Sequence, residues 1–147
     1  MPALLVRLSA AVAPLLAGFA LLAGAAAAGA AEEDPHDLSQ YLWTARPIVI
    51  FADTPNDPRL LRQLRDLEAA REQLDDRDVV VIVDTDPGPS RFETTPLREQ
   101  FRPHDFNILL IDKDGEIKLR RPSPVTASQL IRMIDRQPLR QQELGRR

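Results

Sequence analysis

Residues 48–64 read IVIFADTPNDPRLLRQL and hold the pattern that decides the fold: an apolar strand, a short polar loop and the start of a helix. The apolar run over 47–51 is rich in β-branched residues and carries no charge, which is typical of a buried strand. Asp57 is placed to accept hydrogen bonds from the first free N–H groups of the helix, and Pro58 suits the first helical position. Leucines then recur at helical spacing, so we predict an amphipathic helix from Pro58 to about Leu74.

The sequence VVVIVD at 79–84 is the strongest strand signal in the chain. A continuous apolar run of this length predicts a central strand that is covered on both faces. Together with the strand and helix before it, this run predicts a β-α-β unit with a right-handed crossover.

The second half of the chain predicts a β-β-α unit. A short helix over 97–101 precedes two apolar strands, 106–112 and 116–120, and the KDG sequence between these strands is typical of a tight hairpin. Thr126 is a candidate N-cap for the last helix, which we expect to stop at Pro138.

These elements predict an α/β fold in the order of a thioredoxin-like three-layer core, β-α-β followed by β-β-α. We expect residues 46–138 to form this domain, with room for one hydrophobic core. Residues 31–45 form a lead-in, in which Tyr41 and Trp43 are expected to pack over the rim of the core. Residues 139–147 are expected to be a polar C-terminal tail.

Residues 1–30 differ from the rest of the chain. Arg7 is the only charged residue before Glu32, and the apolar run between them ends in the small residues Ala28-Gly29-Ala30. This pattern predicts a signal peptide that is cleaved near Ala30, and therefore a periplasmic or secreted protein with no stable membrane insertion after cleavage. The alternative is a retained membrane anchor, because the run is long enough to span a bilayer.

The composition excludes several classes of function. The chain has no cysteine, so it forms no disulfide and carries out no chemistry that needs a thiolate. Its formal net charge is −3, which argues against a general nucleic-acid binder, since such proteins usually show a basic surface.

Three stretches, taken in order, resemble a bacterial secreted family of unknown function: RPIVIFA with DPRL, then LLIDKDGEIKLR, then LIRMIDRQPLRQQEL. That family is similar to the P-DUDES domain of sushi-repeat-containing extracellular proteins, and the middle stretch also resembles the hairpin of peroxiredoxin-like and thioredoxin-like proteins. The resemblance covers about residues 43–144. It implies a thioredoxin-like fold in a secreted protein and no catalytic residues. Asp112 departs from the family, which usually has Gly there, and QPLR departs from its usual Met-Pro-Met-Arg.

The loop before the first helix lies where a thioredoxin carries its two cysteines. Pro55 and Pro58 fall near those two positions, and Asn107 falls near the thioredoxin proline that is normally cis, so both redox features are missing. The free N–H groups of the helix could bind an anion. The alternative, which we favour, is that the Asp57 carboxylate caps these groups itself.

Carboxylates gather at the carboxyl ends of the two predicted parallel strands, the edge at which open α/β sheets bind ligands. They are Asp53, Asp57, Asp84 and Asp86. Hard cations such as calcium prefer clustered carboxylates. The alternative is that these residues only cap helices and turns, because they do not follow the spacing of a calcium loop.

Arginines offer a second candidate surface, for an acidic partner. They are Arg98, Arg102, Arg120, Arg121 and Arg140. The alternative is a solvated charged face, which is the more common role of such residues.

The sequence favours a secreted, non-enzymatic thioredoxin-like module that binds a protein partner in the cell envelope. We expect no cofactor, no bound metal and no nucleic acid. The alternative function is small-anion or metal binding, with or without catalysis, at the edge formed by Asp53, Asp57, Asp84 and Asp86.

Overall fold

The computed structural model describes residues 37–85 and 94–146. Its sheet has four strands in the order β2-β1-β3-β4, which are β1 (Arg46–Phe51), β2 (Val79–Asp84), β3 (Asn107–Ile111) and β4 (Ile117–Arg121). β1 pairs in parallel with β2 and antiparallel with β3, and β3 pairs antiparallel with β4. The predicted α/β order, β-α-β followed by β-β-α, is confirmed.

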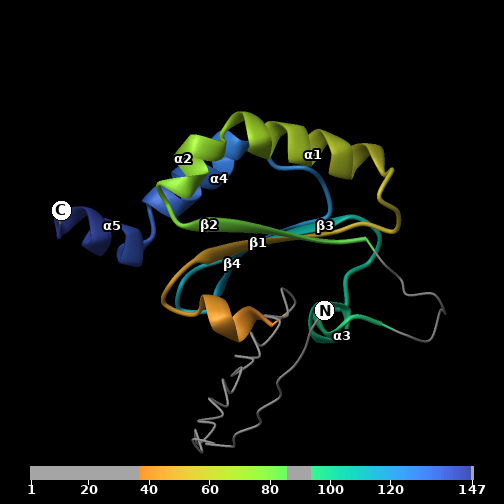
Figure 1. Cartoon of the computed structure of the whole chain (residues 1–147), viewed down its shortest axis with the longest axis horizontal. Helices are drawn as coiled ribbons and strands as arrows, with labels where there is room; N and C mark the ends of the chain where they lie inside the picture. The colour runs from red at the N-terminus through yellow and green to blue at the C-terminus, as the bar shows by residue number, and fades with distance from the viewer. Residues whose placement is uncertain (1–36, 86–93, 147) are drawn as a thin grey trace, which may run out of the picture. The chain divides into compact units, whose positions relative to one another are not determined.

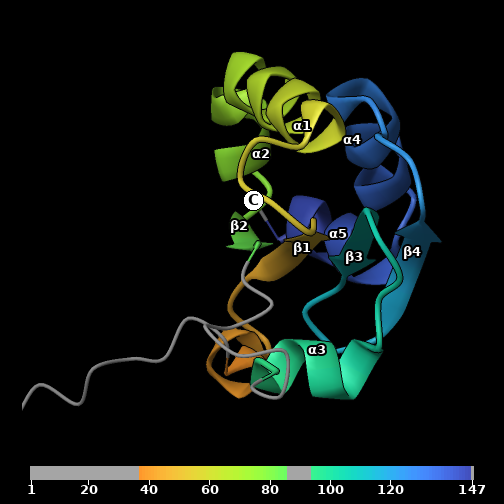
Figure 2. The same ribbon diagram turned by 90° about the vertical axis from the view of Figure 1, so that its right-hand side faces the viewer.

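Helices cover both faces of this sheet (Figures 1 and 2). One face carries α1 (Pro58–Ala69), α2 (Arg71–Asp75) and α4 (Ala127–Asp135), and the other carries the 3-10 helix η1 (Leu38–Tyr41) and α3 (Pro96–Phe101). Successive strand residues point to opposite faces, so each face of the sheet has its own apolar core. Ile48 and Ile50 of β1 pack under α1 and α4, whereas Val49 and Phe51 pack against α3.

β2 lies at the edge of the sheet and not at its centre, so this part of the prediction was wrong. The central strands are β1 and β3, in which every residue is buried. On β2 the side chains of Val81 and Val83 stay 39% and 36% exposed. An apolar run therefore predicted the strand correctly, but it could not specify how many neighbours the strand has.

The predicted helix from Pro58 to Leu74 is divided into α1 and α2. The backbone leaves helical geometry at Ala70, with φ −109° and ψ 16°. Leu74 remains buried in the core although it belongs to the second helix. The leucine spacing thus predicted the buried face correctly and missed the break.

Two predicted local features are confirmed. The hairpin between β3 and β4 closes through Gly115, whose φ of +83° favours glycine and whose N–H donates to the Asp112 carbonyl at 2.9 Å. Thr126 caps α4 in a capping box with Gln129.

Residues at the two ends of the domain depart from the predictions. Tyr41 packs against the core on the α3 side, as expected, but Trp43 is 68% exposed and has a positive φ of 62°. Residues 139–147 are not a simple tail, because α5 (Pro138–Gly145) spans most of them and buries Arg140. α4 ends at Asp135, shortly before Pro138, and Pro138 starts a new helix, since proline fits the first helical position.

No helix in the described parts of the chain is both long and apolar enough to cross a membrane.

Candidate functional site

The junction between β1 and α1 is closed by the chain's own side chains. Oδ1 of Asp57 accepts from the Arg59 backbone N–H at 2.8 Å, which confirms the predicted N-cap. Oδ2 of Asp57 also accepts from the Arg59 guanidinium at 2.7 Å. The helix N-terminus, which sequence analysis considered as an anion site, is therefore occupied by an aspartate.

Arg59 joins this cap to the loop before β3. Its guanidinium donates to both carboxylate oxygens of Asp105, at 2.8 and 2.6 Å, and lies 5.5 Å from the centre of the Phe106 ring. The hydrogen bonds from Arg59 lower the pKa values of Asp57 and Asp105 below the usual range of aspartate. Both carboxylates are thus held in their charged, hydrogen-bonded form, which does not suit a general acid or base at neutral pH.

Sequence analysis placed Asn107 near the proline that is normally cis in thioredoxins. Asn107 begins β3, and its side-chain amide donates to the His104 carbonyl at 3.1 Å. No peptide bond within residues 37–85 and 94–146 is cis.

Asp84, at the end of β2, is fully engaged in holding α3. Its carboxylate accepts from the Thr95 hydroxyl and, at 2.9 Å, from Nε of Arg98. Arg98 also donates to the Ala52 carbonyl at 2.7 Å and lies over the Phe51 ring. Asp84 therefore ties the ends of β1 and β2 to α3.

Asp53, Asp57 and Asp84, the predicted ligand residues that the structure describes, are thus not joined in one open site. Asp57 and Asp84 are buried in separate ion pairs, and Asp53 is exposed. Asp86 lies outside the described residues. Within residues 37–85 and 94–146, no three His, Cys, Asp or Glu residues form a group that could hold a metal ion.

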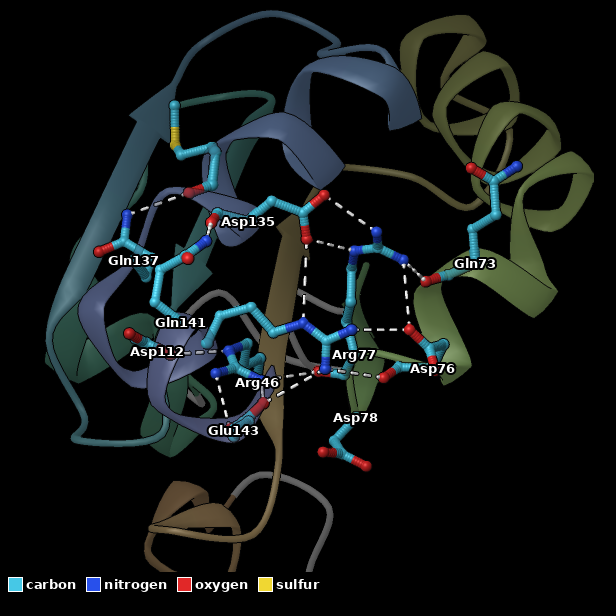
Figure 3. Close-up of polar contacts among 12 residues, drawn as sticks. Arg46, Gln73, Asp76, Arg77, Asp78, Asp112, Asp135, Gln137, Gln141 and Glu143 are labelled. Carbon is cyan, nitrogen blue, oxygen red and sulfur yellow. Dashed lines mark hydrogen bonds and ion pairs between the residues drawn. The ribbon is translucent and has the colours of Figure 1, made fainter. Parts of the chain in front are cut away.

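A buried ionic network that the sequence analysis missed holds α5 in place (Figure 3). Arg46, at the start of β1, donates through Nε to Asp112 at 2.8 Å and through a terminal nitrogen to Glu143 at 2.9 Å. It also donates to the Arg77 carbonyl at 2.9 Å. Arg46 therefore links α5 to the hairpin and to the turn before β2.

Arg140 of α5 adds a second buried arginine to this network. It donates to the Asp76 side chain at 2.7 Å, and Arg77 pairs with Asp135 at 2.8 Å. Lys113 also pairs with Glu143 at 2.9 Å. Burial of Glu143 opposes its ionisation, but the hydrogen bonds from Arg46 and Lys113 outweigh burial and lower the pKa of Glu143 to about 2.

Sequence analysis missed this network because its members are far apart in the chain. Arg46 and Glu143 are separated by 97 positions. The available signal was an arginine at the first position of a buried strand, together with Arg140 and Glu143 spaced three apart on one helix.

The open edge of β2 forms the second notable surface. A groove of about 730 Å³ runs between this strand and the pair α1 and α2, and leucines and valines make up its apolar lining: Leu64, Leu67, Leu74, Val79, Val80 and Val81. Charged residues at its rim include Arg71 and Asp75, which pair with each other at 3.9 Å.

The hydrogen bonding of β1 and β2 determines which backbone groups face this open side. Arg46 N–H donates to the Asp78 carbonyl, and Ala52 N–H donates to the Asp84 carbonyl, so the even-numbered positions of β2 face β1. The N–H and C=O groups of Val79, Val81 and Val83 therefore point away from the sheet. Within the described residues, β1 is the only strand that pairs with β2.

The fold and the site define the class as a thioredoxin-like α/β protein without cysteine. A family described as "Domain of unknown function (DUF4174)" matches residues 37–143, and the chain belongs to this family. A search of curated proteins gives no match. The finer resemblance to P-DUDES stays a prediction.

Solved structures of two peroxiredoxins share the fold. The reduced 2-Cys peroxiredoxin of Plasmodium vivax is 13% identical with a TM-score of 0.54, over 73% of this chain and 84% of that chain. Prx1a of Plasmodium yoelii is 14% identical with a TM-score of 0.50, over 73% and 80% of the two chains. A chloroplastic thioredoxin z is 26% identical with a TM-score of 0.49, over 62% and 76%. The two peroxiredoxins support the fold alone.

Proposed function

We propose that the chain is an exported, non-enzymatic thioredoxin-like module that binds an extended segment of a protein partner along the open edge of β2. The observation that carries this proposal is the composition of the edge. The strand reads VVVIVD, with no charge before Asp84, no proline and an unbroken register with β1. Exposed edge strands normally carry lysine, proline or a bulge that prevents pairing. β2 has none of these devices.

The geometry of the edge specifies the chemistry of the partner. Backbone groups of Val79, Val81 and Val83 point outward and offer the donors and acceptors of a further strand. The side chains of Val81 and Val83 are exposed on the face that carries α1, next to the apolar groove. An extended segment with apolar side chains at alternate positions satisfies both features. A partner strand would also make β2 the covered, central strand that its sequence resembles.

The other observations favour binding over catalysis. The chain has no thiol, and the junction at which thioredoxins carry their cysteines is filled by the ion pairs of Asp57, Arg59 and Asp105. Export, with cleavage near Ala30, is part of the proposal and rests on the composition of residues 1–30.

The experiment is site-specific photo-crosslinking in the cell that makes the protein. A benzoylphenylalanine at Val81 should give one discrete adduct with another protein, and a second change, Val83→Lys, should abolish it because a charge at the edge opposes strand pairing. Leu144→Lys is the matched control: Leu144 is also an exposed apolar side chain, but it lies on α5. That control should leave the adduct unchanged.

Two results would contradict the proposal. One is an adduct that survives Val83→Lys, which would place the partner elsewhere. The other is an adduct with the mass of two copies of this chain, which would make the edge a self-association surface.

A further inference from the structure

A groove on the opposite side of the domain from β2 is lined by arginines that form no ion pairs within the described residues. It lies between β4 and α4, and β4 is the edge strand at the other end of the sheet (Figure 2). Its volume is about 540 Å³. Of the residues that the structure describes, three arginines line it, Arg121, Arg132 and Arg136, and no aspartate or glutamate does.

These arginines differ from those that hold the fold together. Arg46, Arg98 and Arg140 are each bound to a carboxylate at under 3 Å. Arg121 and Arg132, by contrast, are exposed and have no ion pair or hydrogen-bonding partner for their guanidinium groups within residues 37–85 and 94–146. The same holds for Arg136 among these residues. The protein as a whole carries a net negative charge of −3, so a groove with only positive charge is a local reversal of sign.

Helix electrostatics explain only part of this arrangement. Arg136 is the C-cap of α4, where a cation interacts favourably with the helix dipole. Arg121 lies at the end of β4 and gains nothing from that dipole. The groove therefore has a positive charge that the fold itself does not use.

The basic surface continues past the loop that contains Ser123 and Val125. A second hollow of about 560 Å³ shares this loop and is lined by Arg62 and Arg65 of α1. Among the described residues, Asp66 is the one acidic residue of this hollow, and it accepts from the Ala127 backbone N–H at 2.5 Å. Its charge is thus directed at the start of α4.

We propose that the groove between β4 and α4 binds an acidic peptide segment through Arg121, Arg132 and Arg136. Guanidinium groups match carboxylates in charge and in geometry. The floor of the groove is apolar, with Leu119, Val125 and Met133, so it accommodates apolar side chains between the carboxylates. This surface is separate from the β2 edge and goes beyond the function proposed above.

Two features favour a peptide over other anions. The two adjoining hollows are much larger than a single phosphate group. No aromatic side chain from the described part of the chain lines the groove, and single-stranded nucleic acids are bound on aromatic side chains that stack with the bases.

The test is fluorescence anisotropy of the full chain with a fluorescein-labelled peptide, Glu-Leu-Glu-Glu-Leu-Glu. Saturable binding that weakens with salt is expected, because the contacts are exposed ion pairs. Changing Arg121, Arg132 and Arg136 together to Gln should weaken binding by about tenfold or more. Changing Arg71, Arg102 and Arg146 to Gln removes the same charge from other exposed positions and should leave binding within about twofold.

Several results would overturn the proposal. If the two triple variants weakened peptide binding equally, binding would depend only on the net charge of the protein and not on the groove. Undiminished competition by the matching Gln-Leu-Gln-Gln-Leu-Gln peptide would exclude carboxylate recognition. If pyrophosphate or a single-stranded oligonucleotide bound more tightly than the peptide, and this binding required Arg121, Arg132 and Arg136, the groove would be a phosphate-binding site. A melting curve of each variant confirms that it is folded, and these outcomes do not depend on whether β2 binds a partner.

Discussion

Nε of Arg46 donates to Oδ1 of Asp112 at 2.8 Å, and the two side chains are only 1% and 2% exposed. The second oxygen of Asp112 has no hydrogen-bond partner within the described residues. A buried ion pair costs desolvation energy, but the removal of one partner leaves an uncompensated buried charge. Here the pair fixes the start of β1 against the hairpin turn, beside α5.

Asp112→Ala should therefore destabilise the domain strongly. Removing one partner leaves a buried arginine that is compensated only in part, which typically costs about 3–5 kcal/mol. Denaturant unfolding measures the loss. The control is Asp75→Ala, which removes the acid of an exposed pair with Arg71 and should have little effect. A loss for Asp112→Ala no larger than that of the control would show that the pair does not organise the fold.

Stability should fall in acid through Glu143. Its pKa of about 2 in the folded state lies below the ordinary value of 4.5, so its contribution is complete above about pH 4.5 and is lost as the pH falls towards 2. The size of the contribution is at most roughly 3 kcal/mol. Glu143→Gln should lower the free energy of unfolding at pH 7 and flatten its fall between these two pH values.

The matched control is Glu116→Gln, since the Glu116 side chain is 70% exposed and, among the described residues, pairs only with Lys118. Its stability curve should follow that of the wild type. An unchanged acid slope in Glu143→Gln would rule out the anchoring of α5 by Glu143.

Variants of Asp57, the N-cap of α1, distinguish a structural role of this residue from a metal-binding role. Asp57→Ala should lower the melting temperature, because the Arg59 N–H and guanidinium lose their acceptor. Asp57→Asn should recover part of the loss, since its oxygen still accepts from the N–H group. Calcium should change none of these melting temperatures. If calcium raised the melting temperature of the wild type but not that of Asp57→Asn, the result would support the predicted ligand site at this edge of the sheet.

The exported form should begin near Ala31, because the apolar segment ends in a small-x-small sequence. N-terminal sequencing of the protein from the cell envelope measures this directly. An intact Met1 in the membrane fraction would favour the retained anchor.

The sequence predicted those features that depend on neighbours along the chain. Asp57 caps a helix that starts one residue later, Gly115 closes a hairpin within its own turn, and Thr126 pairs with Gln129. Local propensity and spacing determine such features, so a single sequence contains them.

The features it failed to predict depend on residues far apart in the chain. The run VVVIVD specifies a strand, but its place at the edge depends on where β1 and β3 pair. In the same way, the sequence around Asp84 predicted an open ligand site, whereas in the structure Arg98 binds the Asp84 carboxylate. A carboxylate that follows a strand has the same sequence signature whether it binds a ligand or an arginine of its own chain.

Hydrogen exchange at β2 tests the central claim most directly. In the purified chain, the amides of Ile82 and Asp84, which face β1, should exchange slowly, and those of Val81 and Val83, which face outward, should exchange fast. In the complex isolated from the producing cell, Val81 and Val83 should become protected as well, because a partner strand would accept their hydrogen bonds. Fast exchange of both outward amides in that complex would contradict binding along the β2 edge.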